Sequence, residues 1–319
     1  MLTVLFATRN RAQILREVLD AFCQLQAPPT GWKLIVVDNG STDGTPQVLA
    51  SFANRLPLTF LFEPRLGKNF ALNTGLDSSQ GDLIVFTDDD VFPNPDWLIR
   101  LREAADAQPT YSIFGGPILP RWEVPPPRWI RTLDLAPIFA ITPTDLQAGE
   151  LPLHRATQVF GPNMAILASV FASGMRFDTS IGPQGESYAM GSETELVLRL
   201  ARKGHKGWHV PDAVVEHFIR KEQLETSWVM RRAIRMGRGY RRLHGAPRLW
   251  WGLPRTLYRL LPREGLVIAV AWAIRASDIL ARARVRFHFL LGIAIESRLM
   301  SQERSPQASS ASKVATKNP

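Results

Sequence analysis

The sequence has a single cysteine, Cys23, among its 319 residues. One thiol cannot close a disulfide within the chain, and it cannot build a structural zinc site. This excludes the class of small secreted domains that depend on disulfides. We therefore expect the protein to work in a reducing compartment.

Long hydrophobic runs are also missing. No segment reaches the roughly twenty apolar residues that a membrane-spanning helix needs. The first apolar run, residues 2–7, is short and has no basic segment before it, so we expect a β-strand there and not a secretory signal. Hydrophobic residues make up 45% of the chain, which is typical of a globular protein and indicates neither disorder nor a multi-span membrane protein.

Negative charge is scarce in the C-terminal part. Residues 220–263 contain 12 Lys and Arg but only 2 Asp and Glu, whereas residues 1–100 contain 8 Lys and Arg against 11 Asp and Glu. This shift divides the chain. We predict an α/β domain over residues 1–220, a basic amphipathic helical region over 221–300 and a disordered, low-complexity tail over 301–319.

Apolar strands alternate with amphipathic helices in the first third of the chain. The strands are expected at residues 2–7, 33–37, 58–62 and 82–87. Because their apolar runs are continuous and do not alternate with polar residues, they predict a mostly parallel, Rossmann-like sheet with helices on both faces. Ligands of such sheets bind at the carboxyl ends of the strands.

Past this region the pattern is less regular. Residues 108–160 are rich in proline and are expected to form functional loops or small insertions. A helix is predicted over residues 191–204, because acids lie in its first turn and a glycine follows its basic last turn. Two short strands are expected within residues 207–218.

Several carboxylates and one histidine follow these elements. Asp88 and Asp90 form a D-x-D pattern behind the strand at 82–87, Glu193 and Glu195 begin the helix at 191–204, and His217 follows a short strand. Oxygen ligands suit a hard divalent cation, and manganese also accepts an imidazole. Such a cation can neutralise charge on a diphosphate leaving group while a separate carboxylate deprotonates an incoming hydroxyl. This is the layout of a nucleotide-sugar transfer site.

At this point the sequence resembles the family 2 glycosyltransferases with the GT-A fold. The resemblance covers about residues 1–220 and depends on the order and spacing of four segments: "FATRNRAQILREVLDA", "VVDNGSTDGT", "GKNFALNTGLDSSQGDLIVFTDDDVFPNPDWL" and "GSETELVLRLARKGHKGWHVPDAVVEH". It implies a GT-A-like fold, a nucleotide-diphosphate sugar donor and a divalent cation, Mn²⁺ or Mg²⁺. It also implies a glycan or lipid-linked acceptor, in cell-envelope or exopolysaccharide biosynthesis.

The resemblance assigns roles to individual residues. It places these residues at the donor: Thr8, Asn10, Asp38, Lys68, Asp88 and Asp89. It implies metal contacts from Asp88, Asp90 and His217. Members of the family usually take their catalytic base from a Glu-Asp pair, which is Ser192–Glu193 here, so the base is Glu193 or Glu195. We favour Glu193, which would make the transfer inverting.

Two other functions fit parts of the sequence. A catalytically inert nucleotide-sugar-binding domain would account for Ser192 in the acidic pair. A nucleotidyltransferase of similar fold would also use carboxylates and a metal. That class usually has a glycine-rich basic loop after the first strand, whereas the corresponding segment here, "ATRNRAQ", contains no glycine.

The C-terminal arginines show helical spacing. Arg231, Arg235, Arg238 and Arg242 would share one face of a helix, and several aromatic segments follow. We expect a cytoplasmic protein whose basic helices contact anionic lipid on the inner face of the cell membrane. Ordinary packing or oligomer-contact helices are the alternative. Nucleic acid is not a predicted partner, because no groove-reading or RNA-binding motif accompanies the charge.

Overall fold

The computed structural model describes residues 1–319 except 134, 143–144, 154–158, 186, 246–248 and 304–319. The chain forms two compact units. The sheet unit contains Met1–Pro125, Asp134–Glu186 and Ser192–Lys221. The helical unit contains Pro126–Leu133, Ser187–Gly191 and Glu222–Pro319.

An eight-stranded sheet forms the centre of the sheet unit, in the order β3-β2-β1-β4-β9-β6-β10-β8. β9 and β8 are antiparallel to their neighbours, and the other strands share one direction. The predicted mostly parallel sheet is therefore confirmed. The strands span β1 (Leu2–Thr8), β2 (Trp32–Asp38), β3 (Leu58–Phe62), β4 (Leu83–Phe86), β6 (Ile113–Gly115), β8 (Gly149–Leu151), β9 (Met164–Leu167) and β10 (Gly207–His209).

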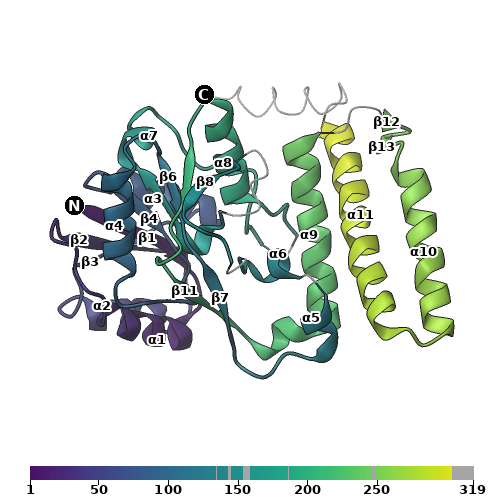
Figure 1. The fold of residues 1–319 in the computed structure, drawn as a ribbon, viewed down its shortest axis with the longest axis horizontal. Helices are drawn as coiled ribbons and strands as arrows, with labels where there is room; N and C mark the ends of the chain where they lie inside the picture. Colours follow the sequence, from purple (N-terminus) through teal and green to yellow (C-terminus); the bar gives the residue numbers. More distant parts are fainter. Residues whose placement is uncertain (134, 143–144, 154–158, 186, 246–248, 304–319) are drawn as a thin grey trace, which may run out of the picture. The chain divides into compact units, whose positions relative to one another are not determined.

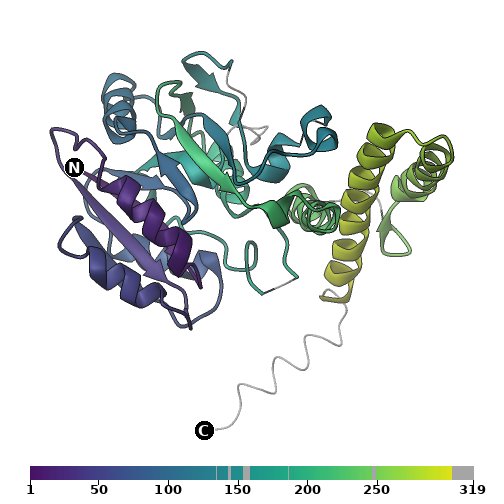
Figure 2. The same cartoon turned by 90° about the horizontal axis from the view of Figure 1, so that it is seen from below.

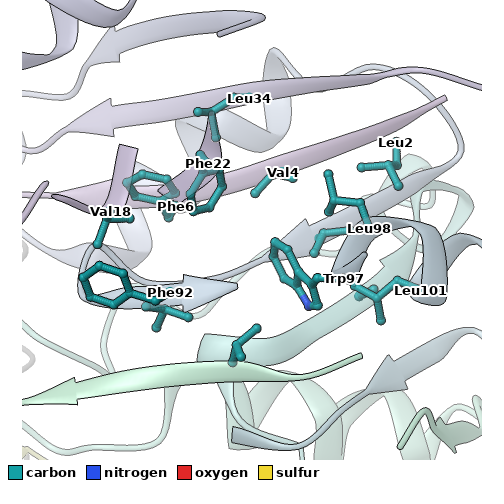
Figure 3. Close-up of a cluster of buried hydrophobic side chains, with 14 of the residues drawn as sticks. Leu2, Val4, Phe6, Val18, Phe22, Leu34, Phe92, Trp97, Leu98 and Leu101 are labelled. Atoms are coloured by element: carbon teal, nitrogen blue, oxygen red, sulfur yellow. The ribbon is translucent and has the colours of Figure 1, made fainter. Parts of the chain in front are cut away.

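Helices cover both faces of this sheet. On one face, Phe22 of α1 and Trp97 of α4 pack against the strand residues Val4 and Phe6 (Figure 3). On the other face, Gly75 of α3 lies directly over Leu5. The helices of this unit are α1 (Ala12–Phe22), α2 (Thr45–Phe52), α3 (Lys68–Asp77), α4 (Trp97–Ala107), α6 (Ala136–Phe139), α7 (Ala168–Ala172) and α8 (Ser192–Arg202) (Figure 1).

A second, three-stranded sheet has the order β5-β11-β7 and contains β5 (Val91–Pro93), β7 (Ile118–Trp122) and β11 (Val215–Ile219). β5 begins one residue after Asp90, and its Val91 lies opposite His217 in the antiparallel register. This small sheet therefore brings the histidine beside the aspartates.

Residues 108–160 contain regular structure that the sequence did not predict. β6 and β8 extend the large sheet, and β7 forms an edge of the small one. These strands are only three to five residues long and lie among prolines, so they carry little periodicity from which to predict them.

A buried asparagine joins the two sheets. Asn163 ends the 3₁₀ helix η2 (Gly161–Asn163), and its Nδ2 donates to the carbonyls of Pro117 and Ala213 at 3.0 and 2.7 Å. Its Oδ1 accepts a hydrogen bond of 2.9 Å from the indole of Trp97. Both the nitrogen and the oxygen of the Asn163 amide are therefore hydrogen-bonded inside the core, where an unpaired polar group would cost about 1–3 kcal/mol.

The helical unit confirms the predicted helical C-terminal region. α11 packs between α9 and α10 (Figures 1 and 2), and α9 and α11 run parallel, since Arg238 meets Glu296 and Arg242 meets Glu303. None of the described helices is both long and apolar enough to cross a membrane. The elements are α5 (Arg128–Thr132), η3 (Lys221–Leu224), α9 (Thr226–His244), β12 (Leu249–Trp250), β13 (Leu253–Pro254), α10 (Leu257–Ala273) and α11 (Ser277–Glu303).

Part of the arginine face of α9 is occupied by α11, although Arg231 on the same face is exposed. Arg238 and Arg242 both bind the buried carboxylate of Glu296 in α11, and Arg241 donates to Ser297 at 2.8 Å. Of the predicted disordered tail over 301–319, residues 301–303 complete α11 and the remainder lies outside the described residues.

We predict that Gly75→Ala destabilises the sheet unit. A Cβ at this position would lie 2.2 Å from Cδ1 of the buried Leu5 and 3.1 Å from Cγ2 of Val37. Overpacking of this kind costs about 1–3 kcal/mol, measured as a lower urea midpoint by circular dichroism. The matched control is Gly265→Ala in α10, where nothing lies within 4 Å of the added carbon. Equal effects of the two substitutions would contradict the packing of α3 on β1.

Candidate functional site

Three consecutive aspartates, Asp88–Asp90, follow β4 at the carboxyl edge of the parallel strands. Asp89 and Asp90 are buried. Three neighbouring carboxylates repel one another and resist burial, so each requires a counter-charge. In this structure every one of the three has a cationic partner from a different element.

Asp88 pairs with Lys68, the first residue of α3. The Lys68 ammonium lies 2.6 Å from Asp88 Oδ1 and 2.8 Å from Glu193 Oε1, so it bridges the two carboxylates. Burial lowers the pKa of Lys68, but the charges of Asp88 and Glu193 outweigh burial and raise that pKa. Lys68 is therefore a permanent cation that holds Glu193, the second residue of α8, beside the aspartates.

Asp89 faces the first strand. Thr8 donates to its Oδ2 at 2.8 Å, and Arg11 Nε lies 3.8 Å from its Oδ1. Burial and the adjacent charge of Asp90 raise the pKa of Asp89 to about 7, despite the opposing effect of Arg11. Asp89 thus fastens the end of β4 to the end of β1.

Asp90 is paired with residues of β11 and the segment after it. His217 Nε2 lies 3.4 Å from Asp90 Oδ1, and Arg220 Nη1 lies 3.6 Å from Oδ2. Burial raises the pKa of Asp90, but the charge and hydrogen bond of His217, together with the charges of Arg11 and Arg220, outweigh burial and lower that pKa. Burial lowers the pKa of His217, and the carboxylate of Asp90 reverses this and raises it.

The orientation of His217 suits a metal ligand. Its Nδ1 donates to the carbonyl of Phe139 at 2.7 Å, which directs Nε2 toward Asp90. Among the described residues, no three His, Cys, Asp or Glu side chains form a group that could hold a metal. The protein donors close together are therefore two, Asp90 and His217. Their oxygen and nitrogen atoms fit a divalent cation that takes its other ligands from a diphosphate.

The predicted donor residues after β1 and β2 form a connected loop pair. Asn10 adopts a positive φ of 53°, and its Oδ1 accepts a hydrogen bond of 2.8 Å from the backbone of Thr42. Asp38 is buried at the end of β2 and accepts from the backbone of Ser41 at 2.9 Å. These side chains shape the two loops that border the strand ends.

Glu195 lies elsewhere. It makes a two-point ion pair with Arg199, at 2.6 and 2.9 Å, and Arg199 also donates to the carbonyl of Arg176. Residues two apart on an α-helix project in nearly opposite directions, so α8 presents Glu193 to Lys68 and turns Glu195 away. The structure thus brings only one of the two candidate bases to the aspartates.

Two residues of the site were missed in the sequence. Arg11 and Arg220 approach Asp89 and Asp90, but they lie in a loop and at a strand end, where no periodicity marks an inward side chain. The one available indication was charge. Three adjacent carboxylates require more positive charge than Lys68 and His217 supply, and each arginine lies three residues after a predicted site residue.

Comparisons with known proteins identify similar sequences. The model of the family described as glycosyl transferase family 2 matches residues 3–177. The succinoglycan biosynthesis protein ExoM of Rhizobium meliloti is 26% identical over 249 residues, which cover 74% of this chain and 74% of ExoM. Glycosyltransferase AglE of Haloferax volcanii is 33% identical over 100 residues, covering 31% of this chain and 33% of AglE.

Solved structures share the fold. The mannosyltransferase PcManGT from Pyrobaculum calidifontis, solved with GDP-Man and Mn²⁺, superposes with a TM-score of 0.64 at 22% identity, covering 95% of this chain and 88% of the other. S. aureus TarS 1-349 with UDP-GlcNAc superposes with a TM-score of 0.55 at 15% identity, covering 94% and 92%. These likenesses confirm the expected GT-A fold.

We predict that Lys68→Met destabilises the protein by about 1–3 kcal/mol, because it leaves two partly buried carboxylates facing each other without a cation. The measurement is the urea midpoint of the ligand-free protein. The triple variant Lys68→Met, Asp88→Asn, Glu193→Gln removes the repulsion and should recover most of the loss. Lys33→Met, at a lysine that hydrogen-bonds only an exposed glutamine, is the matched control. A Lys68 variant as stable as this control would disprove the bridge.

Proposed function

The chain belongs to glycosyl transferase family 2, and on this premise we propose that it transfers a sugar from a nucleotide-diphosphate donor to a glycan or lipid-linked acceptor in exopolysaccharide or cell-envelope biosynthesis. The observation that carries the proposal is the Lys68 bridge between Glu193 and Asp88 at the carboxyl edge of the sheet. The similarity to a succinoglycan biosynthesis protein supports the polysaccharide context.

Glu193 is the proposed general base. Its carboxylate is partly exposed, lies against the backbone of Gly161 and is held by Lys68. From there it would accept the proton of an acceptor hydroxyl as that hydroxyl attacks the anomeric carbon. Direct attack on the face opposite the leaving diphosphate inverts the anomeric configuration. Gly161 has a role in this arrangement, because a Cβ there would lie 2.4 Å from Glu193 Oε1.

Asp90 and His217 are the two proposed protein ligands for a divalent cation, Mn²⁺ or Mg²⁺, and Asp88 next to them is held by Lys68. When bound, such a cation would offset the negative charge that develops on the diphosphate. His217 would bind through Nε2, because Nδ1 is engaged with Phe139. PcManGT was solved with GDP-Man and Mn²⁺, and TarS with UDP-GlcNAc, which supports a GDP- or UDP-linked donor here.

Thr8, Asn10, Asp38 and Asp89 are proposed to shape the donor pocket. Thr8 donates a hydrogen bond to Asp89, and the backbone of Thr42 donates one to Asn10. These bonds hold the strand ends and the loops after them in place before the donor binds. This preorganisation lowers the entropic cost of ordering the site on binding. We place the reaction at the cytoplasmic face of the membrane, where a lipid-linked acceptor would be met.

We predict that Glu193→Gln lowers sugar transfer at least about 100-fold, because the amide cannot accept the acceptor proton. Donor binding, measured by isothermal titration calorimetry, should change less than about threefold. Glu195→Gln is the matched control on the same helix. It loses an ion pair with Arg199 and should reduce stability slightly but leave turnover within about twofold.

Three outcomes would contradict this assignment. Retained transfer by the Glu193 variant, or a larger loss in the Glu195 variant, would show that Glu193 is not the base. If the wild-type protein bound donor and transferred nothing to water or to any acceptor, it would be the catalytically inert binding domain.

We predict that a thermal-shift panel of GDP-mannose, UDP-GlcNAc and UDP-glucose identifies one stabilising donor, and that Mn²⁺ enlarges its effect. Asp90→Asn and His217→Ala should abolish the Mn²⁺-dependent part of the shift, because they remove the paired oxygen and nitrogen donors. Glu195→Gln should retain it. A donor shift equally large with EDTA, or unchanged in both variants, would exclude a metal at this position.

A further inference from the structure

Several large apolar side chains are exposed between the second half of α10 and the first turn of α11. Trp272 is 72% exposed, Ile274 and Leu266 are each 66% exposed, and Ile279 and Val270 are also open to solvent. The antiparallel helices α10 and α11 form a helical hairpin, and we refer to residues 266–282, which join them, as the hairpin tip. Single exposed apolar residues are ordinary, whereas five of them within one short segment are characteristic of a binding surface.

The exposed group follows from the geometry of α10. Leu257, Glu264 and Ala271 are buried at intervals of seven residues and form the side of α10 that packs on α11. Leu266 and Val270 lie on the opposite side, four residues apart. The helix is therefore apolar where it contacts its neighbour and apolar again on the outer side of its last turns.

Charge around the hairpin tip is mostly positive. Arg263, Arg275 and Arg282 are exposed there, and Asp278 is the acid among residues 266–282. Other acids of α10 and α11 are neutralised within the unit. Glu264 is buried 3.7 Å from Arg286, and the buried Glu296 binds Arg238 and Arg242. Within the described part of the chain, Arg263, Arg275 and Arg282 make no salt bridge, and Asp278 is the acid nearest to Arg275 and Arg282 in the sequence.

We propose that the hairpin tip docks into the surface of an anionic lipid bilayer, with Trp272 and Ile274 entering the headgroup region and Arg263, Arg275 and Arg282 on lipid phosphates. An exposed tryptophan together with exposed aliphatic residues and exposed arginines has the composition of an interfacial anchor. A second copy of the chain would bring identical arginines face to face, so charge favours lipid over self-association.

This proposal deepens the proposed function, on which its biological setting rests, by naming the surface that meets the membrane. It also narrows that surface. The basic helices over residues 221–300 were expected to contact lipid, and within them Arg238 and Arg242 of α9 are bound to Glu296. The lipid-facing part is instead at the opposite end of α10 from the hairpin β12–β13 (Figure 1).

The test is co-sedimentation of the full-length protein, without donor, with vesicles of phosphatidylcholine alone or with about one third phosphatidylglycerol. We expect binding to the anionic vesicles that weakens in high salt. The double variant Trp272→Ala, Ile274→Ser should bind about tenfold more weakly, as loss of two inserted side chains implies. Trp251→Ala is the matched control, since Trp251 is 83% exposed but lies between β12 and β13, before the first residue of α10.

Several results would overturn the proposal. They are no binding to anionic vesicles, equal losses in the two variants, or a wild-type dimer that the double variant converts to monomer. Capture of an acidic protein through the tip without lipid binding would also overturn it. Thermal melting confirms that the variants are folded. Donor binding is measured separately on the same samples, so a failed proposed function and a failed docking surface are distinguishable.

Discussion

Counter-charge around Asp88–Asp90 is the constraint on which the rest of the site depends. Lys68, Arg11 and His217 come from three separate parts of the fold, namely the start of α3, the loop after β1 and the strand β11. The aspartates cannot be buried until those parts have assembled around them, because unpaired buried charges cost several kcal/mol each. The same electrostatics therefore couple the folding of the sheet unit to the formation of its site.

Lys68 gives this arrangement a chemical consequence. Its ammonium contacts both Glu193, the proposed base, and Asp88, a proposed donor-binding residue, and so holds the two carboxylates close together. A base held in this way is oriented before any acceptor arrives. The position of Glu193 also depends on Gly161, which leaves room for its carboxylate, so the local backbone and the charge network act on the same side chain.

The sequence predicted the fold best where apolar residues form continuous local runs. The apolar runs at residues 2–7, 33–37, 58–62 and 82–87 marked β1, β2, β3 and β4, which are adjacent parallel strands, and the aspartates lie at the predicted edge. Residues 108–160 were not predicted, since their strands are short and gain stability from neighbours distant in the chain. Helix periodicity places Glu193 and Glu195 on different sides of α8, but which side faces the aspartates depends on how α8 packs against Lys68, and the sequence does not contain that information.

The register of β11 has a further consequence. His217 lies opposite Val91 on one edge of this strand and opposite Pro120 on the other, so β5 and β7 jointly set its position. Successive strand residues project to opposite faces, and a shift by a single residue would bring Glu216 or Phe218 beside Asp90 in place of the imidazole. Insertions or deletions in the segment between β10 and β11 would thus act on the chemistry of the site from a distance, by moving one strand along its neighbours.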